Sequence, residues 1–474
     1  MAIESTPSST DAGLKSLWWS PQLAGPVVLA AAVRFGLMGL GLARTGGSAV
    51  EGTDTYSYLI PGQSLLYHGA FYADGVPALM RTPAYPLFLA VTSVAGFAIA
   101  SAVNILLSLF CVVLVWRLGR VVSGSDRIGM GAAWLIAIEP MTTIFSILLL
   151  SETLFMAFFL YGMERLAWFL RSSRLSAVAV AGLAFAGAAF VRPAAYYLPV
   201  ALALGLLAVL MRRPGLRWKA PALLLICSLP WLIAWQVRNK VETGYGGFSS
   251  ARELNLYFTN AVEITARVEH RNYFDVHQEF GYFTFYHQSG QTYLSQPYLD
   301  HHPEQASWSQ AQRIAFLGVE GGKVIRAHPA MYARTCVEPL ASMLIEPGAG
   351  YFARMLHLED TELTNGVGTN QGVAHFGLNL IKTHPMIAAS KVAFMAVLLV
   401  LYVLALRGLI RHLIGNPHLA LLLGTAFYFI GLCAVTAGPG YDPRFRVPIM
   451  PVVCIFAAAG LVHVKKIGSR RSVA

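Results

Sequence analysis

The sequence predicts an all-α polytopic membrane protein of about ten transmembrane helices, with a small mixed domain outside the membrane. Three observations predict it. Of the 474 residues, 56% are hydrophobic and only 12% are charged, whereas a soluble domain carries about 25% charged residues. Apolar runs long enough to cross a bilayer recur along the chain. The basic residues gather in alternate loops, so the net charge of +11 favours cytoplasmic loops over nucleic-acid binding.

Ten apolar runs are the candidate spans. They cover residues 24–45, 84–118, 128–146, 148–167, 175–191, 194–211, 219–237, 386–406, 417–436 and 447–464. The second run is too long for one straight helix. We expect Gly96 to divide it into a short re-entrant piece and a full span.

The positive-inside rule sets the orientation. With the N-terminus in the cytoplasm, every basic cluster falls on the inner side: Arg117, Arg120 and Arg127; Arg165, Arg171 and Arg174; Arg212, Arg213, Arg217 and Lys219; Arg407 and Arg411; Lys465, Lys466, Arg470 and Arg471. Both termini are then cytoplasmic. The polar stretch 1–20 is interpreted as a cytoplasmic lead-in, because no small-residue cleavage pattern follows it.

The chain divides into three predicted parts. Residues 1–237 form an N-terminal transmembrane module that includes a first outer loop, 46–83. Residues 238–385 form an extracytoplasmic domain, and residues 386–474 form the C-terminal transmembrane helices. No internal repeat of the transporter type and no low-complexity tract interrupts this division.

The first outer loop carries a carboxylate, Asp54, and an arginine, Arg81, close to the membrane. Asp54 is a candidate catalytic base; alternatively it caps a short helix that begins near Thr55. Tyr58, four residues on and on the same helical face, is a candidate substrate- or phosphate-binding residue that would orient Asp54 or a sugar hydroxyl. Arg81 is a candidate phosphate ligand, because arginine holds phosphate oxygens in a two-pronged fork. The alternative for Arg81 is snorkelling or binding of any phospholipid headgroup.

Four further charged residues are candidate substrate- or phosphate-binding groups: Glu152, Arg192, Arg238 and Arg444. Glu152 lies in an apolar run, where a carboxylate is costly and usually functional; we expect it to pair with Arg192 or Arg34 if it is structural. The three arginines fall at outer ends of spans, where each either binds phosphate or anchors its helix.

The sequence indicates no metal site and no disulfide framework. Four of the five cysteines lie in apolar runs, and no CxxC, HxH or HExxH spacing occurs. His270, His277, His301 and His302 are therefore interpreted as solvated side chains. We expect no cofactor.

Several motifs together resemble the GT-C superfamily of membrane glycosyltransferases, in the branch of the protein O-mannosyltransferases and lipid A aminoarabinose transferases. They are DTYSY (54–58), RTPAYPLFLA (81–90), SETLF (151–155), FVRPAAYYLP (190–199), LPWLIAWQVRN (229–239) and YDPRFRVPIMP (441–451). They run along most of the membrane part, whereas residues 245–380 match little. Many relatives have a second acid where Thr55 stands here, and some have a basic residue where Ser57 stands.

The resemblance implies an inverting glycosyltransferase of the bacterial inner membrane whose active site faces the exterior. Its donor is a polyprenyl-phosphate sugar, its acceptor hydroxyl belongs to a glycan, a lipid or a protein, and the first-loop acid, Asp54, is the general base. The residues alone leave two other classes open. One is a transporter or flippase of a lipid-linked or anionic substrate; the other is a non-catalytic scaffold.

Overall fold

The structure is a computed structural model that describes residues 18–282, 291–357, 382, 385–412, 416–436 and 442–462. These residues are almost entirely helical. The two strands among them, β1 (Tyr72–Ala73) and β2 (Val76–Pro77), pair antiparallel within the first outer loop. The predicted mixed character therefore belongs to that loop, because the polar segment that follows the N-terminal helices is helical where the structure describes it.

Seven helical spans in the described part of the chain are long and apolar enough to cross a membrane. Their main helices are α2 (Ala24–Thr45), α5 (Phe97–Ser123), α8 (Glu152–Ser172), α12 (Lys219–Thr243), α22 (Pro385–His412), α23 (Pro417–Thr436) and α24 (Met450–Leu461), the last preceded by η8 (Pro443–Ile449). An eighth is the bent pair α6 (Asp126–Ile138) and α7 (Pro140–Ile147). Shorter apolar helices are α4 (Ala84–Thr92), α9 (Leu175–Val191) and α10 (Leu198–Val209). Helix is thus present in each of the ten predicted runs; α9 has the predicted bounds, whereas α10 is shorter than its run of 194–211.

Local breaks explain the shorter pieces. Gly96 has φ of 104°, a conformation that favours glycine, and it separates the short α4 from α5 as the sequence predicts. Pro140 begins α7 after Glu139, and the two helices meet at 58°. Proline lacks the N–H that would continue the α6 hydrogen-bond ladder, so the run 128–146 cannot form one straight helix.

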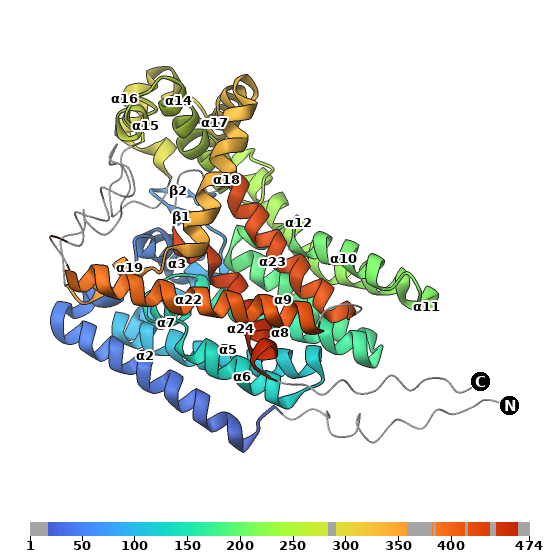
Figure 1. The fold of residues 1–474 in the computed structure, drawn as a ribbon. Coiled ribbons are helices and arrows are strands. Elements are labelled where there is room, and N and C mark those ends of the chain that lie inside the picture. Colours follow the sequence, from blue (N-terminus) through green and yellow to red (C-terminus); the bar gives the residue numbers. More distant parts are fainter. Residues whose placement is uncertain are drawn as a thin grey trace, which may run out of the picture.

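Helix α8 lies at the centre of the membrane bundle. Most of its residues are buried, and it packs along α5 and α9. At 1.5 Å per residue, its 21 residues separate its two ends by about 30 Å. Figure 1 shows α11 (Pro214–Arg217) at one end of the bundle and α3 (Thr55–His68) with the β-hairpin towards the other. Glu152 and Arg171 therefore mark opposite ends of the bundle.

Glycines allow two helix pairs to approach closely. A Cβ added to Gly62 in α3 would lie 2.1 Å from the carbonyl oxygen of Pro86 in α4. Cβ atoms added to Gly408 in α22 and Gly460 in α24 would lie 2.0 and 2.1 Å from carbonyl oxygens of the facing helix. Small residues at such crossings are the usual basis of helix packing in membranes.

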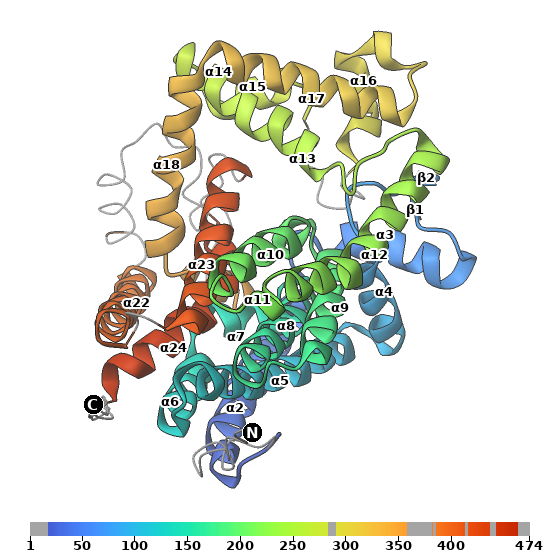
Figure 2. The same cartoon turned by 90° about the vertical axis from the view of Figure 1, so that its right-hand side faces the viewer.

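Residues 244–282 and 291–345 fold back over the end of the bundle that carries the first loop. They contain α13 (Ala251–Leu254), the π-helix η5 (Asn255–Ala261), α14 (Val262–Val268), α15 (Tyr273–Glu279), α16 (Gln296–His301), α17 (Gln310–Ala327) and α18 (Pro329–Ile345). In Figure 2, α13 to α17 lie above the bundle and α18 descends beside it. This group, here called the α13–α18 segment, ends shortly before α19 (Ala349–Met355).

The α13–α18 segment is fastened to the first loop by side chains. Gln291 accepts a hydrogen bond from the Leu79 backbone N–H at 3.2 Å and donates to the Ala73 carbonyl at 3.1 Å. Ser249 donates to the carbonyl of Met80, the residue before Arg81. The position of Arg81 thus depends on a segment more than 160 residues away in the sequence. The predicted basic group at 465–471 lies outside the described residues, as do residues 437–441 before η8.

Candidate active site

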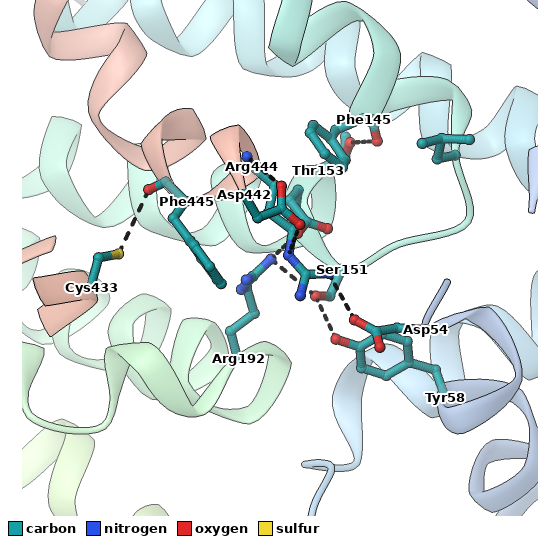
Figure 3. A network of polar contacts seen from close by, with 12 residues as sticks. Asp54, Tyr58, Phe145, Ser151, Thr153, Arg192, Cys433, Asp442, Arg444 and Phe445 are labelled. Atoms are coloured by element: carbon teal, nitrogen blue, oxygen red, sulfur yellow. Dashed lines mark hydrogen bonds and ion pairs between the residues drawn. The ribbon is translucent and has the colours of Figure 1, made fainter. Parts of the chain in front are cut away.

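Ends of several helices converge around Asp54. They are the start of α3, the start of α8, the end of α9 and the start of η8. Figure 3 shows the side chains that these ends bring together. The network holds three arginines and three carboxylates: Arg81, Arg192 and Arg444 with Asp54, Glu152 and Asp442. Formally these six charges cancel.

Asp54 occupies the N-cap position of α3, but its side chain accepts no capping hydrogen bond. Its two oxygens contact two arginines instead, Oδ1 at 2.9 Å from Arg81 and Oδ2 at 2.8 Å from Arg444. Burial by itself raises the pKa of Asp54, but the positive charges of Arg81 and then Arg444 outweigh it and hold that pKa below its usual range. Asp54 is therefore ionised, 26% exposed and able to accept a proton.

Arg81 is held from three directions. Its Nε donates to Ser57 Oγ at 3.0 Å, and one terminal nitrogen donates to the Tyr58 hydroxyl at 3.1 Å. The guanidinium also lies over the Tyr58 ring, 4.2 Å from its centroid, a geometry that contributes about 0.5–2 kcal/mol. Tyr58 therefore positions Arg81. Arg81 contacts both the Tyr58 hydroxyl and Asp54, so Tyr58 orients Asp54 only through this arginine.

Arg444 joins Asp54 to a second acid, Asp442. The Nε of Arg444 lies 3.0 Å from Asp442 Oδ2, and the Tyr351 hydroxyl lies 2.7 Å from both Asp442 oxygens. Burial and then the negative charge of Asp442 raise the pKa of Tyr351 well above its usual value, so this hydroxyl stays protonated and donates. Asp442 also caps η8 by accepting from the Arg444 backbone N–H.

Glu152 pairs with Arg192 and not with Arg34. The Arg192–Glu152 ion pair crosses from the end of α9 to the start of α8, and Arg192 also donates to Ser151 Oγ at 3.4 Å. Ser151 lies 3.0 Å from the Tyr58 hydroxyl. Arg192 and Glu152 are therefore linked to Arg81 through Ser151 and Tyr58, as Figure 3 shows in part.

Other charged candidates lie elsewhere. Arg238 pairs with Glu242 one turn on and donates to the Phe71 carbonyl, so its recorded partners are outside the Asp54 network. Arg446 is buried and donates to the carbonyls of Met343 and Glu346, which ties the end of α18 to η8. Arg34 donates to the carbonyls of Ala137 and Ala30. Arg238 thus lies outside the arginine–carboxylate network around Asp54, and its phosphate-binding role stays a prediction.

The histidines that the sequence singles out take part in aromatic packing rather than in a common cluster. His277 stacks on Tyr282 with 4.1 Å between ring centroids, and His302 packs on Tyr298 at 4.6 Å. His277 and His302 are therefore not the solvated side chains that the sequence suggested, and burial lowers the pKa of His277 to about 4, whereas His270 and His301 are exposed as predicted. Among the described residues no group of three or more His, Cys, Asp and Glu side chains is placed to hold a metal ion.

Sequence reasoning missed Asp442, Tyr351, Ser57 and Ser151 as members of the network. Asp442 lies within the YDPRFRVP motif, of which only Arg444 was a predicted site residue. Tyr351 lies outside every matched motif, and no sequence signal points to it. Thr55, which replaces an acid of many relatives, is fully buried and donates to the Leu149 carbonyl at 3.0 Å, so it fastens the start of α3 to the chain before α8.

The arrangement can bind an anion beside a base. Two partly exposed arginines share one carboxylate, and an anionic group that enters can recruit either guanidinium. Tyr282 of the α13–α18 segment lies near enough that the charge of Asp54, after burial, contributes to raising its pKa. Its ring packs on His277 and Phe258.

No family model matches the chain, and no curated protein is significantly similar to it in sequence. Solved structures are similar in fold. The oligosaccharyltransferase AglB of Archaeoglobus fulgidus, in complex with an inhibitory peptide and a dolichol-phosphate, is 14% identical, with a TM-score of 0.49 over 93% of this chain and 49% of that one. This chain thus spans about half the length of AglB.

Two further structures show the same kind of likeness. ArnT of Cupriavidus metallidurans bound to undecaprenyl phosphate is 12% identical, with a TM-score of 0.37 over 92% of this chain and 78% of that one. The arabinosyltransferase EmbB of Mycobacterium smegmatis is 14% identical, with a TM-score of 0.30 over 91% and 41%. Likenesses of this size carry no argument about activity. These proteins are GT-C membrane glycosyltransferases, the superfamily that the motifs of this sequence resemble.

Proposed function

We propose that this protein is an inverting glycosyltransferase that moves a sugar from a polyprenyl-phosphate donor to an acceptor hydroxyl. The observation that carries the proposal is one ionised carboxylate, Asp54, held between two partly exposed arginines, Arg81 and Arg444. A base beside fixed positive charge is what transfer from a phosphate leaving group requires.

Donor binding begins with a competition for the arginines. The phosphodiester of the donor carries one negative charge, and Arg81 and Arg444 are the partly exposed cations that contact Asp54. As the phosphate recruits an arginine, one oxygen of Asp54 loses its partner and becomes free to accept a proton. Ser57 and Tyr58 hold Arg81, and Asp442 with Tyr351 holds Arg444, so both guanidinium groups stay in place during this exchange.

In the chemical step the acceptor oxygen attacks the anomeric carbon as Asp54 takes its proton. The bond between that carbon and the phosphate oxygen breaks, and the phosphate leaves with the electron pair and a second negative charge. Attack opposite the leaving group inverts the anomeric centre, and a single carboxylate is sufficient for it. Asp54 becomes neutral as the phosphate gains charge, so the arginines stabilise the same total charge throughout.

Donor and acceptor partners follow from this chemistry. The lipid-linked donor reaches the site from the membrane, and the acceptor is a glycan, a lipid or a protein that presents a hydroxyl beneath the α13–α18 segment. The step as proposed uses no metal or other cofactor, because the arginines supply the positive charge.

We further propose that the site faces the exterior of a bacterial inner membrane. Arg171 and Arg213 lie at the far end of α8, where they donate to the backbone carbonyls of Val121 and Leu170. That end carries the basic loops that the positive-inside rule assigns to the cytoplasm. Asp54 lies at the other end of α8, about 30 Å away by helix rise.

The test compares wild type with Asp54→Asn in lipid nanodiscs supplied with extracted polyprenyl-phosphate sugars and membrane glycolipids. Mass spectrometry then detects a product that has gained a sugar. We expect transfer by wild type and loss of transfer in the variant. If neither protein transfers sugar although both bind the lipid phosphate, the proposal is wrong and the transporter or flippase hypothesis gains support. Flux of a lipid-linked substrate across proteoliposomes would then decide that alternative.

A further inference from the structure

A cavity lies inside the membrane bundle, directly behind the Arg192–Glu152 ion pair. Its volume is about 30 Å³. Its walls come from α2, α5, the bent pair α6 and α7, α8 and the end of η8. The polar groups that line it are Arg34, Glu152, Ser108, Thr142, Thr153 and Cys111, and the remaining wall is apolar.

Two charged side chains at this cavity are incompletely satisfied. Arg34 is 1% exposed and Glu152 is 3% exposed. The Nε of Arg34 and the Oε2 of Glu152 have no hydrogen-bond partner among the described residues. A buried, unpaired polar atom costs about 1–3 kcal/mol, and more when the group is charged. Each of these two groups satisfies its other atoms through the protein, so the missing partner of each is expected in the cavity.

The hydroxyl groups in the wall suit the same kind of ligand. Ser108, Thr142 and Thr153 each donate to a backbone carbonyl, of Ile105, Glu139 and Phe145 respectively. Their protons are therefore used, while their oxygens can still accept. A ligand here must accept a hydrogen bond from Arg34 and donate hydrogen bonds to Glu152 and to the hydroxyl oxygens. Water can both accept and donate in this way, whereas a simple anion cannot donate and a cation cannot accept.

We propose that this cavity is a binding site for a small cluster of ordered water that bridges Arg34 and Glu152. A water needs roughly 10–15 Å³ of such volume and two to four polar partners, so the cavity holds about two. The water supplies the missing partners of Arg34 Nε and Glu152 Oε2. It thereby supports an ionised Glu152 in the bundle, and Glu152 in turn holds Arg192 towards Ser151 and the Asp54 network. This last role rests on the proposed function.

Radiolytic footprinting tests the water directly, because hydroxyl radicals made from bound water oxidise the side chains that touch it. Cys111 and Met156 line the cavity. Cys454 and Met163 are matched controls, since both are buried and neither lines it. For the full-length protein in nanodiscs, we expect Cys111 and Met156 to be oxidised several-fold faster than Cys454 and Met163, as read by mass spectrometry. Equal rates for the two sets would overturn the proposal.

A pair of variants then links the water to the site. Val115→Ile adds one methylene to the cavity wall, and Val113→Ile adds the same group to the same helix away from the cavity. We expect Val115→Ile, and not Val113→Ile, to slow the oxidation of Cys111 and Met156 to the control rate and to lower sugar transfer several-fold. Labelling that is unchanged in Val115→Ile counts against the water site. If Val115→Ile slows the oxidation of Cys111 and Met156 but wild type transfers no sugar, the water site is supported and the proposed function is refuted.

Discussion

Replacing Asp54 by asparagine should separate catalysis from donor binding. Asparagine keeps the shape of the side chain but removes its charge and its basicity. Turnover should fall by about 10²–10⁴-fold, the usual contribution of a positioned general base. The same change removes the charge from the contacts at 2.9 Å to Arg81 and 2.8 Å to Arg444, and leaves one amide oxygen that can accept from only one of the two arginines.

In this variant Arg81 and Arg444 are held less tightly, so they should bind the lipid phosphate more tightly. An exposed ion pair contributes up to about 1 kcal/mol, and a hydrogen bond to a charged group contributes about 1.5–3 kcal/mol. The Asp54 carboxylate and the Arg81 side chain are 26% and 15% exposed, so the pairs lie between these cases. A gain of about 1.4 kcal/mol corresponds to tenfold tighter binding. The expected result is therefore lost turnover together with an unchanged or lower Kd.

The assay measures kcat for sugar transfer and, separately, the Kd of polyprenyl phosphate for the same nanodisc preparations. Asp442→Asn is the control, because it weakens the hold on Arg444 while the base remains; it should retain far more turnover than Asp54→Asn. An Asp54→Asn protein that turns over at the wild-type rate would refute the assignment of the base. A Kd of polyprenyl phosphate that rises tenfold in Asp54→Asn would refute the proposal that the Asp54 carboxylate and the phosphate compete for the arginines.

Three further predictions follow from single contacts. Tyr351→Phe removes the hydroxyl that donates to Asp442, so we expect KM for the donor to rise several-fold with a smaller change in kcat in steady-state assays; an unchanged KM would count against a positioning role. Gly408→Ala should sharply lower the yield of monodisperse protein in size-exclusion chromatography, because its Cβ would lie 2.0 Å from a carbonyl oxygen, whereas Gly431→Ala meets nothing within 4 Å and serves as control. Burial lowers the pKa of His277 to about 4, against about 6.5 in an unfolded chain, so thermal stability should fall as pH drops from about 6.5 towards 4; His277→Gln should flatten that dependence, and parallel curves would contradict it.

Sequence patterns predicted the local features of the fold well. Hydrophobic run length located helices in all ten predicted places, because a bilayer-length apolar stretch must satisfy its backbone within itself. Gly96 was predicted to divide α4 from α5, and its positive φ shows why. The bend at Pro140 was not predicted, although Glu139 and Pro140 interrupt the apolar run and proline cannot continue the helix ladder.

The candidate site was predictable in part. Asp54, Arg81, Arg192, Glu152 and Arg444 were all singled out, since charged residues beside apolar runs are rare enough to stand out. Which of them meet could not be read from the sequence. The contact between Asp54 and Arg444 joins residues 390 positions apart, and the packing of η8 against α7 and α8 places Arg444 there.

By itself, the sequence determined that the chain is a helical membrane protein with charged groups at the ends of its spans. Composition and run length act locally, so they are visible in any stretch of the chain. The tertiary structure decided that Tyr58 positions Arg81 and that Glu152 pairs with Arg192. It also decided that Arg238 pairs with Glu242. Asp442, itself bound by Tyr351, holds Arg444. Such pairings depend on the direction of each side chain from its own helix and on how helices cross, and neither is encoded in the order of residues within one segment.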